Sequence, residues 1–380
     1  MTKSVSWLTI SDVHLGKRGR TIEILKNLKW YLGPENPWYP QIRDVDILFI
    51  AGDLFDDSLD FKSDEVHEII LWLSQLFHFC NVHDIRLRIL EGTPSHDHRQ
   101  SRIADTALRI LKDPLDFRYI SKIEVEIFED LGVSCLYIPD EYGTGPDANY
   151  QECFDALRQA GLSQADIGIY HGFFKFQLPA AIKDHPAHDE NSHLSLIKGF
   201  INIGHDHSFK TYKRLIVQGS FDRLSHGEEE PKGGVLCVHN PDSENRFHFV
   251  ENKHAKVFKT VDLKSPDLEK SLTQLRKALA KIPELSYVRI RARKTHPLYL
   301  AFEELKIKFP MYNFSKKSVE DEQEESDTLA STHQSTDDKF MPIHINKDNI
   351  VELLMREVST KHSLTQRQLT LLSSSLEGMV

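Results

Sequence analysis

Five apolar stretches of the sequence each run into aspartate or histidine, the residue types that bind metal ions. The first, 5–10, leads into Asp12 and His14, and the later ones lead into Asp53, His96 with Asp97, His171, and His205 with His207. Because side chains alternate across a strand, Asp12 and His14 point to the same side. Each residue alone is also typical of a turn or a helix cap, but the five groups together favour a divalent-metal site beyond the strand ends.

The mixture of carboxylates and imidazoles indicates which metals and which chemistry to expect. Imidazole is a borderline ligand, so this set suits Mn, Fe or Zn better than Ca or Mg. There are enough residues for two ions that share one carboxylate. Two ions about 3.5–4 Å apart can bind a phosphoester and activate a bridging water for in-line attack on phosphorus. A nearby histidine can then give the leaving oxygen its proton.

The elements that must position these residues are apolar runs bounded by turn residues. They predict strands at 5–10, 45–50, 85–90, 133–138, 166–170, 200–203 and 214–218, followed by a hairpin of 235–238 and 247–250. Helical spacing predicts helices at 64–79, 103–111 and 150–160, and the Gly- and Pro-containing stretch 142–149 is predicted to be a loop. Continuous apolar runs are typical of strands buried on both faces.

The pattern changes after residue 252. Strands predicted at 257–263 and 287–292 and helices at 267–281 and 298–308 indicate a small α+β domain at 253–315. Its Arg289, Arg291 and Arg293 alternate along one strand face and are followed by Lys294. This row is either a solvated strand face or an edge that contacts phosphates.

The last 65 residues differ again in composition. Residues 316–341 are polar and acidic and are predicted to form a disordered linker, because they lack the apolar content to fold. Helical spacing returns at 342–380 as two short amphipathic helices, which cannot form a stable fold alone. They are expected to dock on a partner, or else to pack back onto the main domain.

Composition bounds the class of protein. The chain has 380 residues, of which 40% are hydrophobic and 27% charged, as is typical of soluble globular proteins. Its four cysteines are far apart and no apolar run approaches a membrane span of about 20 residues, so a reducing, cytoplasmic location is expected. The net charge of −10 argues against a generally basic nucleic-acid coat but permits a local basic groove.

These motifs resemble a known family. Asp12-x-His14, Gly52-Asp53, His96-Asp97, His171 and Gly204-His205-x-His207 occur in the order of the calcineurin-like metallophosphoesterase motifs. The resemblance implies an α/β (α+β) fold, a four-layer double β-sandwich flanked by helices, over residues 1–252. The stretch from Gln218 to Gly234, of the form GS…E…KG, resembles the SbcD-type DNA repair nucleases and the related recombination endonuclease subunits of large bacteriophages.

The resemblance implies roles for the motif residues. One ion would be held by Asp12, His14 and His207, the other by His171 and His205, with Asp53 bridging two divalent ions that are expected to be Mn²⁺. His96 would be the general acid or would stabilise the transition state, oriented by Asp97. The family usually has Gly-Asn-His, whereas this chain has Gly92-Thr-Pro-Ser95-His96. Ser95 would then take the place of the asparagine ligand, so that the second site is weaker or is completed by water or a shifted loop.

The resemblance also implies a substrate and partners. The chain would be a 3′→5′ exonuclease and endonuclease subunit for DNA repair or recombination, in a bacterial or phage-infected cell. It would pair as a homodimer and bind an SbcC-type coiled-coil ATPase through its C-terminal helices. Seven cations near the motifs are either grips for DNA phosphates or solvated surface charges: Lys17, Arg18, Arg20, Arg99, Arg102, Lys175 and Arg223.

Two other functions stay open from the sequence. One is a phosphoesterase for a small molecule or a phosphoprotein, although Asp56-Asp57 does not match the continuation found in protein phosphatases. The other is a non-catalytic interaction subunit with a decayed metal site. Ser95 favours decay, whereas the retained histidines argue against it.

Overall fold

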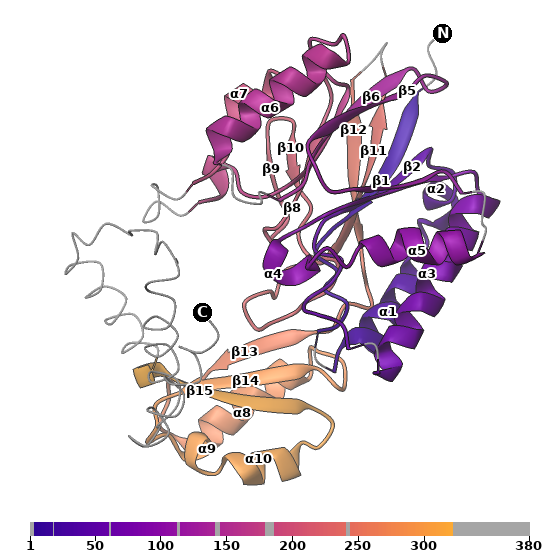
Figure 1. Ribbon diagram of the computed structural model, residues 1–380. Helices are drawn as coiled ribbons and strands as arrows, with labels where there is room; N and C mark the ends of the chain where they lie inside the picture. Colours follow the sequence, from indigo (N-terminus) through magenta and orange to yellow (C-terminus); the bar gives the residue numbers. More distant parts are fainter. Residues whose placement is uncertain are drawn as a thin grey trace, which may run out of the picture. The chain divides into compact units, whose positions relative to one another are not determined.

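Two six-stranded β-sheets carry the residues of the predicted metal site (Figure 1). The computed structural model describes residues 4–17, 19–60, 62–111, 115–140, 145–178, 186–240 and 244–321. The first sheet has the order β12-β11-β1-β2-β3-β4 and the second the order β5-β6-β7-β8-β10-β9. Both sheets mix parallel and antiparallel strands.

The motifs follow strands of the parallel part of each sheet. In the first sheet these are β1 (Val5–Ile10), β2 (Ile47–Ala51), β3 (Arg86–Leu90) and β4 (Phe117–Ile120), with β11 (Gly233–His239) and β12 (Arg246–Glu251) as an antiparallel pair. In the second they are β6 (Val133–Ile138), β7 (Ile167–His171), β8 (Ile201–Gly204) and β10 (Leu215–Val217), with β5 (Glu124–Phe128) and β9 (Lys210–Tyr212) antiparallel at the edges.

The side chains of the two sheets pack against each other and form a core. Trp7 and Phe49 of the first sheet share one buried cluster with Cys135 and Ile169 of the second. The alternate residues of β1 and β2, such as Leu8 and Ile50, belong to a different cluster on the outer face. Because both faces are buried, the strands read as continuous apolar runs.

Helices cover the outer faces (Figure 1). The first sheet packs against α1 (Thr21–Tyr31), α3 (Asp64–Val82) and α5 (Arg102–Leu111), and the second against α6 (Pro146–Gln159) and α7 (Glu190–Leu194). Short helices α2 (Tyr39–Ile42), α4 (Pro94–Asp97) and η1 (Lys175–Gln177) lie in the connections. The order helix, sheet, sheet, helix confirms the predicted double β-sandwich.

Several elements differ from the expectation. Residues 146–149, predicted as loop, form the first turn of α6, because proline is well accommodated where the backbone N–H has no helical partner. Strands β4 and β5 and helix α1 were not predicted. Both strands lie at sheet edges and are only half-buried, so that their apolar content does not stand out in the sequence.

A smaller sheet follows the two large ones. Strands β13 (Phe258–Asp262), β14 (Tyr287–Ala292) and β15 (Asn313–Ser318) are all parallel, and β15 was not predicted. Helices α8 (Leu268–Leu279), α9 (Pro297–Leu300) and α10 (Phe302–Lys308) share a buried core with this sheet. The helix predicted at 298–308 is thus two helices that meet at Ala301, whose ψ of 34° is not helical.

The rest of the prediction for the chain's end is not described by the structure. Residues 1–318 form one compact unit. Most of the predicted linker and all of the helical pair at 342–380 lie outside the described residues. Among the described helices, none combines the length and apolar character needed to span a membrane.

Candidate metal centre

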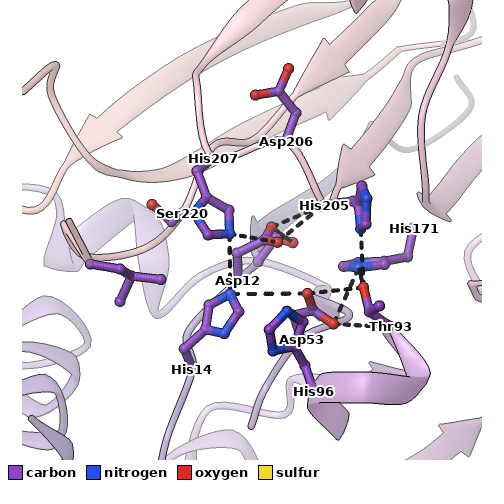
Figure 2. Close-up of polar contacts among 12 residues, drawn as sticks. Asp12, His14, Asp53, Thr93, His96, His171, His205, Asp206, His207 and Ser220 are labelled. Carbon is purple, nitrogen blue, oxygen red and sulfur yellow. Dashed lines mark hydrogen bonds and ion pairs between the residues drawn. The ribbon is translucent and has the colours of Figure 1, made fainter. Parts of the chain in front are cut away.

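Six of the predicted ligands meet at the carboxyl ends of four strands from both sheets (Figure 2). Asp12 and His14 follow β1, and Asp53 follows β2, both in the first sheet. His171 ends β7, and His205 with His207 follow β8 in the second sheet. The site therefore lies where the ends of the two sheets face each other.

The backbone at these residues is held in an unusual conformation. Asp12, His14, Asp53 and His205 have φ angles of 50°, 55°, 47° and 92°. Non-glycine residues seldom adopt such angles, and those that do are concentrated at functional sites. Hydrogen bonds between the two loops fix the conformation: Asp12 N donates to Gly52 O at 3.1 Å and His14 N to Asp53 O at 3.1 Å.

The first group of ligand atoms comes from Asp12, His14 and His207. The Nε2 atoms of His14 and His207 lie 3.2 Å apart, and His207 Nε2 lies 3.7 Å from Asp12 Oδ1. Two imidazole nitrogens that face each other beside a carboxylate suit a shared cation. This is the set that the resemblance assigned to one ion.

The second group comes from Asp53, His171 and His205. His171 Nε2 lies 3.3 Å from Asp53 Oδ1, while the other carboxylate oxygen, Oδ2, lies 4.0 Å from His14 Nε2. Asp53 thus presents one oxygen to each group, as a bridging carboxylate does. The donor set of both groups fits two divalent ions of the Mn, Fe or Zn type.

Partners outside the two groups orient the imidazoles. His171 Nδ1 donates to Ala51 O at 2.8 Å, and His207 Nδ1 lies 3.2 Å from Glu228 Oε1. His14 Nδ1 lies 3.0 Å from Asp56 Oδ1. A proton held on Nδ1 leaves the Nε2 lone pair for a metal, and such partners commonly tune affinity. Asp56 and Glu228 were not predicted for this role, although both belong to motif stretches.

Electrostatics favour a charged pair at the bridge. Burial alone would raise the pKa of Asp53. The nearby His171, and to a lesser degree His14 and the Thr93 N–H, lower this pKa by more than burial raises it, so the pKa is well below its usual range. Burial lowers the pKa of His171, but Asp53 offsets this and raises it to about 10. A divalent ion held by Asp53 and His171 would supply the positive charge that the buried carboxylate requires.

His96 lies beside the two groups, where it forms a third candidate ligand group with His14 and Asp53, and it is oriented differently from the expectation. Its Nδ1 lies 3.0 Å from the backbone oxygen of Asp56, and its ring centroid is 4.9 Å from that of His14. Asp97, which was expected to orient it, instead accepts hydrogen bonds from the N–H groups of Phe55 (2.8 Å) and Gly92 (2.7 Å). Asp97 therefore does not orient His96. Helix α4 turns the Asp97 carboxylate inward, where it holds the loop after β2 to the loop after β3, while His96 stays about one-third exposed.

Ser95 does not occupy the place expected for it. It is exposed on α4, and the hydroxyl that reaches the second group belongs to Thr93. Thr93 directly follows Gly92, as the asparagine does in the family motif, and the two extra residues come after it. Counting forward from the glycine, rather than back from the histidine, would have identified Thr93.

The predicted DNA-binding cations separate into two kinds. Arg20 and Arg223 hold the small sheet to the rest of the unit. The Arg20 guanidinium is buried over the rings of Phe258 and Tyr287, and Arg223 donates to the backbone oxygens of Ala255 and Lys256 at 3.2 Å. These two therefore have structural partners within the chain.

The other predicted cations remain at the surface. Arg99, Arg102 and Lys175 are exposed, with Lys175 3.8 Å from Asp189. Lys17 is one-third exposed and bonds Asp56 at 3.0 Å. Arg18 lies outside the described residues.

Comparison with known proteins adds little to this geometry. No family model and no curated protein matches the sequence. Among solved structures 34 chains match, and one of them, a crystal structure, is 14% identical with a TM-score of 0.41, over 65% of this chain and 100% of that chain. That likeness is too distant to argue from. The sheet order and the two His/Asp groups are themselves consistent with the metallophosphoesterase-like fold that the motifs resemble.

Proposed function

We propose that this protein is a metal-dependent DNA nuclease that hydrolyses phosphodiester bonds. The observation that carries the proposal is the two ligand groups with Asp53 between them, one carboxylate oxygen 4.0 Å from His14 Nε2 and the other 3.3 Å from His171 Nε2, with His96 grouped with His14 and Asp53. Two divalent ions bound there would polarise a phosphodiester and activate a water molecule. A phosphoester hydrolase is therefore the function class that the site supports best.

His96 is suited to the remaining step, which is proton donation to the leaving oxygen. The Asp56 backbone oxygen accepts from Nδ1, which fixes the ring, so the proton for the leaving oxygen would come from Nε2 of the doubly protonated imidazole. Its partial exposure leaves room for a leaving group to approach. General acid catalysis by such a histidine contributes about 10²- to 10⁴-fold.

DNA as the substrate is supported by the exposed cations and by the sequence resemblance. Arg99 and Arg102 come soon after α4, and Lys175 comes soon after His171. These three exposed cations can therefore contact the phosphates of a DNA strand that runs through the site. By the same resemblance the native ions would be Mn²⁺, the chain would form a homodimer in the cytoplasm, and residues 342–380 would dock on an SbcC-type ATPase.

The test is Mn²⁺-dependent release of mononucleotides from end-labelled linear DNA. Asp53→Ala and His96→Ala are expected to abolish or greatly reduce release. Asp206→Asn is the matched control, because Asp206 lies between two ligands in the sequence but points away from them (Figure 2). If wild-type protein cleaves a small chromogenic phosphodiester in a His96-dependent manner but leaves DNA intact, with and without a co-purified ATPase, the substrate assignment is wrong.

A further inference from the structure

The side chain of Thr93 is directed at the second ligand group and not at its own helix. Thr93 is the N-terminal cap residue of α4, where threonine usually accepts a hydrogen bond from a backbone N–H of the first turn. Here its side chain makes no such bond. Its backbone N–H donates to Asp53 Oδ1 at 2.5 Å, which fixes the residue beside the bridging carboxylate.

Three ligand atoms converge on the Thr93 hydroxyl oxygen. Oγ1 lies 3.2 Å from Asp53 Oδ2, 3.2 Å from His171 Nε2 and 3.0 Å from His205 Nδ1. A hydroxyl donates one hydrogen bond and accepts two, so these contacts use its full capacity, with the carboxylate as acceptor and the two imidazoles as donors. Three candidate metal-ligand atoms around one hydroxyl are more neighbours than a helix-capping threonine needs.

The spacing matches that of neighbouring ligands on one cation. With metal–ligand bonds of about 2.1 Å, adjacent ligands of an octahedral ion are separated by about 3.0 Å. The distances from Thr93 Oγ1 to His171 Nε2 and His205 Nδ1, and the 3.3 Å between His171 Nε2 and Asp53 Oδ1, fall close to this value. Asp53 Oδ2, which is also 3.2 Å from Oγ1, is the carboxylate oxygen that faces the first group. The hydroxyl thus lies where a further ligand of the same ion belongs.

We propose that Thr93 Oγ1 is a ligand of the second ion, together with Asp53, His171 and His205. The inference rests on the two-ion centre of the proposed function and adds a ligand that the sequence motif did not assign. A neutral alcohol is a weaker ligand than a carboxylate or an imidazole. The second site therefore binds its ion more weakly than the site of Asp12, His14 and His207, and the two ions load in sequence.

The test is Mn²⁺ titration of the full chain by calorimetry, with electron paramagnetic resonance to detect spin-coupled ion pairs. Wild type is expected to bind two ions in two steps and to show the coupled signal at saturation. Thr93→Val keeps the shape but removes the oxygen, and should weaken the second step by about 10-fold or more while leaving the first unchanged. Thr93→Ser retains a hydroxyl and should restore most of the second step.

Ser95→Ala is the matched control and should titrate like wild type. Thermal unfolding of the metal-free variants shows whether each is folded. If Thr93→Val binds both ions as wild type does, or if Ser95→Ala loses the second ion instead, the assignment of Thr93 is wrong while the nuclease proposal stands. If wild type itself binds no ion pair, both proposals fail.

Discussion

Glu228 acts on the metal centre through one of its ligands. Its Oε1 lies 3.2 Å from His207 Nδ1, and its Oε2 accepts from Ser220 Oγ at 3.0 Å and from Leu224 N at 3.2 Å. The buried ammonium of Lys232 lies 3.2 Å from the same oxygen and donates to His207 O at 2.6 Å. This network holds both the ring and the backbone of His207, which explains the residue types of the GS…E…KG stretch.

Glu228→Ala is expected to weaken the first Mn²⁺ site by about 10- to 100-fold, because His207 loses the acceptor that orients its ring. Glu228→Gln keeps an acceptor oxygen and should lose less. The affinity of each step is measured by calorimetric titration, with urea unfolding of the metal-free chain alongside it.

Glu229→Gln is the matched control for Glu228. Its carboxylate bonds Thr260 N at 2.7 Å and Lys259 Nζ at 2.6 Å on the small sheet instead of His207. The role of Glu228 would be refuted if Glu228→Ala and Glu229→Gln lowered metal affinity equally, or if Glu228→Ala changed only the unfolding free energy.

At the scale of elements, α7 and the residues just before it pack against β7 through two buried histidines, His193 on the helix and His188 ahead of it. His193 lies in contact with Tyr170, with ring centroids 5.3 Å apart, and His188 lies 4.7 Å from His193. Burial lowers the pKa of His188 to about 4 and that of His193 to about 3, although Asp140 and Asp189 act in the opposite direction. Both rings are therefore neutral in the folded chain at neutral pH.

These two histidines should make the fold sensitive to acid. In the unfolded chain the two histidines become protonated below about pH 6.5, whereas in the folded chain they stay neutral until about pH 4 and 3. The unfolding free energy therefore falls as the pH falls through this window. The slope is up to about 1.4 kcal/mol per pH unit for each group. Urea unfolding between pH 7 and 4 measures it.

His193→Gln should flatten the dependence on pH, even if it lowers stability at pH 7. His67→Gln is the control, because His67 is exposed on α3. An equal slope in wild type and His193→Gln would show that protonation of His193 does not contribute.

The sequence predicted those elements whose signal is local. Buried parallel strands such as β1 and β7 are continuous apolar runs, and their ends mark Asp12, His14 and His171 without any tertiary information. The half-buried edge strands β4 and β5 have no such signal. Counting from Gly92 indicates Thr93 and counting from His96 indicates Ser95, and the path of the loop before α4 shows that the Thr93 hydroxyl is the one that reaches Asp53.

At the scale of the whole unit, Arg20 joins the small sheet to the two large ones. Its guanidinium lies 2.9 Å from Glu23, 3.5 Å from the buried Asp222, and over the rings of Phe258 and Tyr287 at 5.5 and 5.7 Å. Such a contact depends on residues more than 200 positions apart, so the sequence alone suggested a DNA-binding cation. The burial of Arg20 instead predicts a role in stability.

Arg20→Ala is expected to lower the unfolding free energy by about 3–5 kcal/mol, because it leaves Asp222 buried without its cation. Hydrogen exchange of β13 and β14 should increase, since their rings lose the guanidinium that packs on them.

Arg99→Ala is the contrasting variant: Arg99 is exposed, so its loss should reduce DNA affinity and the salt dependence of binding with little change in stability. If Arg20→Ala weakened DNA binding at unchanged unfolding free energy and exchange rates, Arg20 would be a DNA contact after all. The attachment of the small sheet would then have to depend on Arg223 and Lys259.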